Sequence, residues 1–340
     1  MRSRLGYGAV LAISCAALFG SIMLACLWGS ADIDFSDALG AILKKLPLIG
    51  GVFESSETAD IIVAGIRLPR VLSAALVGGA LAVCGCALQG LFKNPMADTG
   101  VLGVSSGAGL GATAAIVFSL NAYLGTGAVT ICAFIGGVVS VILVYIVSRS
   151  RAGSSTMGLL LAGMCISSLL TSAQTLIMML ARSQMDSVLS WTMGSFSSSS
   201  YEKLAWAAPL IITGCILLFI LARPLDLMLM GSTQAAHMGV NVKRTTIGIM
   251  FLTALVCSAA VAISGIISFV GLIIPHILRL LVGPGHRRLI PLSFIAGAAF
   301  MTLTDLLART LAAPVSLPVG VFTSILGAPF FLWLYRRRTK

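Results

Sequence analysis

Uncharged stretches of about twenty residues recur along the whole sequence and predict membrane-spanning helices. The hydrocarbon core of a bilayer, about 30 Å thick, needs roughly 20 helical residues to cross it. Charged residues and clusters of Gly, Pro and Asn separate the stretches. Taken in order, they predict ten spans at about 7–28, 70–92, 100–119, 127–148, 154–181, 204–222, 245–265, 267–283, 290–309 and 317–335. We therefore expect an all-α integral membrane protein with a single domain over residues 1–340.

The first apolar run and the polar segment that follows it are interpreted separately from the other spans. The basic start followed by an apolar run could be a signal peptide, but the uncharged run 5–31 is longer than a typical signal core. We therefore expect this run to be retained as the first span. The polar segment 29–66 holds a possible short surface helix over 35–46.

Composition supports the membrane assignment and gives an orientation. The chain is 58% hydrophobic and 10% charged, with mean hydropathy +1.04, whereas soluble domains carry about 25% charged residues. Its net charge of +11 is spread between apolar runs, which indicates orientation in the membrane rather than nucleic-acid binding. With ten spans, fifteen of the 22 Lys and Arg residues fall on the side of both termini. The positive-inside rule then predicts cytoplasmic termini, as in a multi-pass protein of the bacterial inner membrane.

The sequence offers no catalytic constellation. It contains no P-loop, HExxH or Gly-x-Ser-x-Gly motif, and its eight cysteines lie in or beside apolar runs without a CxxC spacing. We expect no bound metal and no enzymatic activity. Asp305 and Arg309, four residues apart, could form a structural ion pair, an exposed docking charge or a proton relay.

The lack of charged residues within the predicted spans limits the ways in which a transport protein of this sequence could be energised. Ion-coupled carriers usually place acids near the bilayer midplane, and the predicted midplane here is almost free of charge. A channel or a motor-driven permease remains. The cytoplasmic segment 223–244 is short and amphipathic, so it could dock in a groove of a soluble motor, although a simple surface connector would have the same composition.

Several long motifs resemble one family of transport proteins, the FecCD permeases. The resemblance runs in order along essentially the whole chain, and only Met96 and Thr99 depart mildly from the family pattern. The motifs are Arg67-Leu-Pro-Arg70, Gly78-Gly-Ala-Leu-Ala82, Gly85, Gln89, Asn94-Pro-Met-Ala-Asp98, Leu102-Gly-Val-Ser-Ser-Gly-Ala108, Leu161-Ala-Gly163, Trp191-Thr-Met-Gly-Ser195, the run from Ser264 to Arg279, Asp305, Arg309, Leu317-Pro-Val-Gly320 and Gly327-Ala-Pro-Phe330.

The resemblance implies a type II importer permease, the membrane subunit of an ATP-binding-cassette (ABC) importer. Such a subunit pairs with a second permease, here expected to be an identical copy, around a central pathway. Two cytoplasmic ATPase subunits carry ATP and Mg, and a substrate-binding protein docks outside. This chain would bind no cofactor of its own. The expected cargo is an iron–siderophore, with haem or cobalamin as alternatives.

The resemblance also implies roles for particular residues. The residues expected to dock the binding protein are Arg67, Arg70 and Arg309, as exposed charges whose ion pairs are each worth only about 0.2–1 kcal/mol and weaken with salt. The cytoplasmic gate is expected at Asn94, Pro95, Met96, Ser154, Ser155 and Thr156. The path is expected to be lined by Ser168, Gln174 and Met178. ATPase coupling is expected at Leu225, Asp226, Met228, Met230, Gly231, Ala235, Gly239 and Val240.

Overall fold

The computed structural model describes residues 6–29, 33–44, 55–125, 127–148, 156–313 and 315–338. Within these ranges the chain forms helices and turns and contains no β-strand. The elements are α1 (Tyr7–Leu27), α2 (Phe35–Leu43), α3 (Glu57–Ala59), η2 (Asp60–Arg67), α4 (Leu68–Leu91), η3 (Thr99–Leu102), α5 (Val104–Val117), α6 (Asn121–Leu124), α7 (Ala128–Ser148), α8 (Thr156–Leu180), η4 (Arg182–Gln184), α9 (Met185–Thr192), α10 (Tyr201–Ile220), α11 (Ala222–Leu229), α12 (Ser232–His237), α13 (Val242–Ser264), α14 (Val270–Val282), α15 (His286–Thr310) and α16 (Val319–Arg338).

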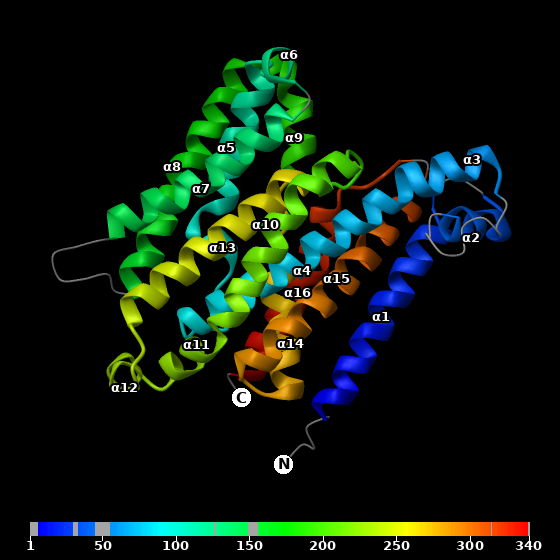
Figure 1. Cartoon of the computed structure of the whole chain (residues 1–340). Coiled ribbons are helices and arrows are strands. Elements are labelled where there is room, and N and C mark those ends of the chain that lie inside the picture. The colour runs from blue at the N-terminus through cyan, green and yellow to red at the C-terminus, as the bar shows by residue number, and fades with distance from the viewer. Residues whose placement is uncertain are drawn as a thin grey trace.

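A helix overlaps each of the ten predicted spans in order. Among the described residues, seven helices are long and apolar enough to cross a membrane, and three shorter apolar helices complete the set at Val104–Val117, Val270–Val282 and Val319–Leu332. The two chain ends lie at the same end of the molecule, together with α11 and α12, while α2, α3 and α6 lie at the opposite end (Figure 1). This arrangement agrees with an even number of spans.

The second span begins earlier than predicted. The helix runs without interruption from Glu57 through η2 to Leu91, a length of 35 residues, whereas the charge pattern placed its start near residue 70. The side chain of Ser56 accepts a hydrogen bond from the Ala59 N–H at 3.2 Å and caps the true start. Pro69 is tolerated because it occupies the first turn of α4. Arg67 and Arg70, which the charge pattern places at the membrane boundary, lie within this long helix and bind partners on other elements, as described below.

Helix α4 forms the core of the subunit. Of its apolar window, 89% is buried inside the chain, and α4 lies among α13, α14 and α15 (Figure 1). Small residues allow these close contacts, because a Cβ atom on Gly78 would overlap the Gly297 carbonyl of α15 and one on Gly85 would overlap the Gly271 carbonyl of α14. Close approach at small residues is a common source of helix association in membranes.

Helix α8 is the least enclosed of the long helices, with 17% of its apolar window buried. It packs on one side against α5 and α7, which contact each other closely at Gly107 and Gly136. It also contacts η3, η4 and α9, and much of its remaining surface is exposed in the single subunit. Such a face must meet lipid or another subunit.

Candidate functional site

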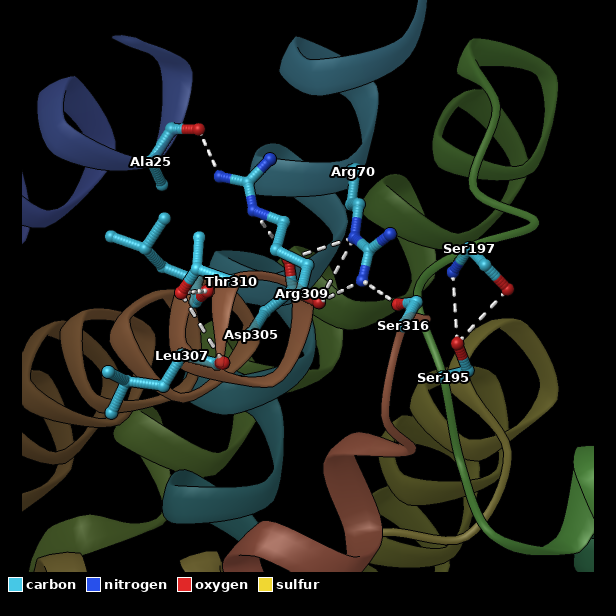
Figure 2. A network of polar contacts seen from close by, with 10 residues as sticks. Ala25, Arg70, Ser195, Ser197, Asp305, Leu307, Arg309, Thr310 and Ser316 are labelled. Carbon is cyan, nitrogen blue, oxygen red and sulfur yellow. Dashed lines mark hydrogen bonds and ion pairs between the residues drawn. The ribbon is translucent and has the colours of Figure 1, made fainter. Parts of the chain in front are cut away.

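A buried cluster of charges lies at the outer end of the subunit, where the first turn of α4 meets the last turns of α15 (Figure 2). The Arg70 guanidinium donates to both carboxylate oxygens of Asp305, with Nη2–Oδ1 at 2.8 Å and Nε–Oδ2 at 3.0 Å. Arg70 also donates to the Ser316 hydroxyl at 3.2 Å. Arg309 follows Asp305 by one turn, with 4.0 Å between its Nε and Oδ2. One carboxylate that is 1% exposed therefore lies between two cations.

Two arginines of this region hold the outer end of α1. Arg67 donates through Nη1 to the carbonyl oxygens of Leu27 at 2.7 Å and Cys26 at 3.1 Å. Arg309 donates through Nη2 to the Ala25 carbonyl (Figure 2). The last carbonyls of a helix have no partner within it and carry partial negative charge, so cations stabilise them. The two guanidinium groups thus fasten α1 to α4 and α15.

The expectation that the three docking arginines are exposed is wrong for Arg67 and Arg309, which are only 3% and 5% exposed. Their charges are satisfied by backbone carbonyls and by Asp305, which the sequence could not show. Arg70 retains 12% exposure of its side chain. The ion pair between Asp305 and Arg309 is present, but Arg70 is the closer partner of the acid. The docking role of all three stays a prediction.

The inner loop after α4 turns sharply at Asn94. Its side-chain oxygen accepts a hydrogen bond from the Met96 N–H at 2.9 Å, and Lys93 before it has φ of 50°. Met96 is 40% exposed, so the loop presents it at the surface. Asp98 accepts from the Thr99 N–H at 2.8 Å; desolvation raises the pKa of its carboxyl, and these hydrogen bonds from Thr99 act in the opposite direction.

The second predicted gate segment cannot be compared with this loop. Ser154 and Ser155 lie outside the described residues, and Thr156 is the first residue of α8. The pairing of the two gate segments therefore stays a prediction.

The predicted path residues on α8 fall on different sides of the helix. Gln174 is 8% exposed, with its amide oxygen against Gly109 of α5 and its Nε2 at 3.4 Å from the Thr192 hydroxyl of α9. Its amide thus lies inside the subunit, whereas a residue that lines a path between two subunits would face out of it. Ser168 is exposed and Met178 is half-buried. The exposed face also carries the hydroxyl side chains of Thr171, Ser172 and Thr175.

The predicted coupling segment folds as α11 and α12, joined at Gly231, whose φ of 129° suits glycine. Its members divide into an inward and an outward set. Leu225, Met228 and Ala235 are buried against the subunit, Gly231 and Val240 are half-buried, and Met230 and Gly239 are exposed. Only the outward set is available to a soluble partner.

Asp226 connects this segment to a spanning helix. Its carboxylate accepts from the His286 backbone N–H at 2.9 Å and lies 2.6 Å from His286 Nδ1, at the first residue of α15. A carboxylate in this position caps the helix and interacts favourably with its dipole. Asp226 thus forms a direct polar contact between α11 and the first turn of α15. His286 is 1% exposed and its Nε2 lies beside Gly90 of α4.

We expect Asp226→Ala to lower substrate uptake per ATP hydrolysed while leaving ATP hydrolysis by the partner subunits largely intact. The lost cap and ion pair should also cost about 0.5–2 kcal/mol of stability. Uptake and phosphate release measured together in proteoliposomes check this, with Asp34→Ala, which removes an exposed carboxylate at the opposite end of the subunit, as the control. An unchanged ratio of uptake to hydrolysis would show that α11 does not act through α15.

Sequence reasoning missed two polar contacts near the inner end. The first is the contact between Asp226 and His286. The second is made by Gln89. The Gln89 Nε2 donates to the Gly271 carbonyl at 3.1 Å, and the Gln89 Oε1 accepts from Arg279 Nη1 at 2.9 Å. Gln89 thus joins α4 to α14. A lone polar residue in an apolar helix indicates that Gln89 has a polar partner, but the sequence does not identify that partner, because Arg279 lies 190 residues away.

Comparisons with known proteins agree over most of the chain. The FecCD transport family matches residues 17–337. The chain is 42% identical over 278 residues to the hemin transport system permease protein HmuU of Yersinia pestis, covering 81% of this chain and 83% of that protein. It is 39% identical over 297 residues to the cobalamin import system permease protein BtuC of Halobacterium salinarum, covering 87% and 78%.

A solved structure extends the agreement to the fold. An inward-facing metal-chelate type ABC transporter superposes on this chain with a TM-score of 0.82 at 29% identity, covering 97% of this chain and 99% of the other. The order of helices described above is therefore shared with that ABC transporter.

Proposed function

Because the chain belongs to the FecCD transport family and is the permease subunit of an ABC importer, we propose that its cargo is a metal chelate, most specifically an iron–siderophore. The compared proteins support the class of cargo, since hemin, cobalamin and the chelate of a metal-chelate type transporter each hold a metal ion within an organic ligand. Haem and cobalamin are the alternative cargoes within the same class.

The permease is a multi-pass inner-membrane protein and not itself an enzyme. Family membership implies ATPase subunits on one side and a substrate-binding protein on the other. We propose that the ATPases bind the outward set, Met230 and Gly239, which follow α11 and α12 at the end of the molecule that holds both termini (Figure 1). The binding protein would meet the opposite end, near Arg70.

The exposed face of α8 is the observation that best supports a metal chelate as the cargo. Hydroxyl groups at 168, 171, 172 and 175 are exposed on a helix long enough to span the membrane. Lipid chains offer no hydrogen-bond partners, so polar groups within a span normally face other helices or water. Two copies placed with these faces toward each other would enclose a pathway lined by hydroxyl and apolar groups. Helix α8 carries no charged side chain between Thr156 and Leu180, which suits a bulky chelate that keeps its own metal ligands.

The test is uptake into proteoliposomes that contain the permease with its ATPase and binding protein. Equal amounts of a ferric hydroxamate siderophore, haem and cobalamin are offered with ATP, with ADP, and without the binding protein. We expect ATP-dependent uptake of the siderophore, lost when either partner is omitted. Preferred uptake of haem or cobalamin would overturn the proposed cargo alone. Full-rate uptake by the permease without its ATPase would indicate a channel or an ion-coupled carrier.

A further inference from the structure

A polar cavity and an apolar groove adjoin at the outer end of the subunit, away from the contacts used above. The cavity has a volume of about 280 Å³ and is lined by serine side chains of the 190–198 segment, Asn121 and Lys203. The groove, of about 420 Å³, lies between α7 and α10 and is lined by Gly127, Ile131 and Trp206 together with Glu202. Thr130 and Lys203 line both. The two hollows therefore adjoin at these two residues.

Lys203 supplies a fixed positive charge at the junction. Its ammonium donates to the Ser198 carbonyl at 2.8 Å and to the Ser198 hydroxyl at 3.1 Å. An ammonium has three N–H donors, so these two contacts leave one donor for a ligand. Glu202, the neighbouring residue, is exposed and places a carboxylate on the groove side. The site therefore presents one positive and one negative group a short distance apart.

The groove continues into the apolar surface of the spans. Trp206 is held edge-on against Phe134, with ring centroids 5.2 Å apart and an interplanar angle of 88°. Tryptophan side chains concentrate at the level of lipid headgroups. Below the groove, α7 continues with an exposed stripe at Ile135, Val139, Ile142 and Ile146. An apolar groove that leads into such a stripe suits an acyl chain.

We propose that this site binds one phosphatidylethanolamine molecule of the outer leaflet. Its phosphate lies at Lys203 and the serine hydroxyls, its ammonium at Glu202, and one acyl chain in the groove beside Trp206. The charge pattern selects this headgroup, because an anionic lipid without an amine leaves Glu202 unpartnered next to a negative ligand. The ligand bridges α7 and α10 at the outer surface.

Native mass spectrometry of the full chain in mild detergent tests the proposal. The probes are phosphatidylethanolamine, phosphatidylglycerol with the same acyl chains, and free phosphoethanolamine. We expect the wild type to retain phosphatidylethanolamine, Lys203→Met to lose about tenfold in its retention, and Lys203→Arg to keep it. Lys93→Met, which removes an exposed lysine at the inner end, is the matched control.

Glu202→Gln provides a test that does not depend on a buried substitution, since Glu202 is exposed. It should remove the preference for phosphatidylethanolamine over phosphatidylglycerol while keeping binding of both. Equal retention of the two lipids by the wild type would overturn the proposed headgroup. Absence of retained lipid, unchanged retention in a helical Lys203→Met variant, or displacement by free phosphoethanolamine at equal concentration would each overturn the site.

Discussion

Asp305→Ala should lower the free energy of unfolding by about 3–5 kcal/mol, because it leaves buried cations without their counter-charge. Asp305 is 1% exposed and is held by Arg70 in a two-pronged ion pair, while Arg309 lies 4.0 Å from its other side. Arg309 also fastens the Ala25 carbonyl at the end of α1. Repulsion between the two arginines should therefore loosen α1 as well as α15. The unfolding midpoint in detergent micelles measures the effect.

Two comparisons separate this effect from a general loss of negative charge. Asp186→Ala removes an exposed carboxylate on the same side of the membrane and should change the midpoint little. The double variant Arg70→Met, Asp305→Leu should lose less than the sum of its single variants, since removing both charges leaves fewer of them uncompensated. Additive losses would mean that the pair does not act as a unit, and a wild-type midpoint for Asp305→Ala would refute the predicted role of the cluster.

The spanning helices could be predicted from the sequence because the membrane imposes a simple rule on it. A charge-free run of the required length is visible without any knowledge of contacts, and the structure places helices over all ten predicted runs. The same rule failed at the start of the second span. The rule places Arg67 and Arg70 at the membrane surface, but a charged side chain can lie within a long helix when carbonyl groups and a carboxylate from distant elements accept its hydrogen bonds.

The sequence could not show which residues contact each buried polar side chain. A pair between Asp305 and Arg309 was one of the alternatives that the sequence offered, because both lie on one helix, where four-residue spacing indicates contact, and their side chains lie 4.0 Å apart. Its closer partner Arg70 lies 235 residues away, and Asp226 and His286 are 60 residues apart. No periodicity relates such positions. The burial of Gln174 could not be predicted either, since it depends on a glycine of another helix leaving room for the amide.

The close approach of α4 to α14 is the second feature whose removal should have a large effect, because backbone atoms of the two helices are in contact there. A Cβ atom on Gly85 would overlap the carbonyl oxygen, the carbonyl carbon and the Cα of Gly271. Backbone atoms cannot rotate away as a side chain can, so the helices must separate. One turn further on, the Gln89 amide donates to the same Gly271 carbonyl at 3.1 Å, and separation would lengthen that bond too.

Gly85→Ala should therefore destabilise the permease by roughly 1–3 kcal/mol through overpacking alone, and by more if the Gln89 hydrogen bonds are lost. Gly20→Ala is the matched control, because Gly20 also lies in a spanning helix and a Cβ atom there meets nothing within 4 Å. That control should be neutral or stabilising by up to about 1 kcal/mol, since alanine favours helix over glycine. Opposite signs for the same chemical change would identify contact between α4 and α14, rather than helix propensity, as the cause. Equal effects of the two substitutions on the unfolding midpoint would show that α4 and α14 can separate without cost, and that the close approach at Gly85 contributes nothing to the stability of the subunit.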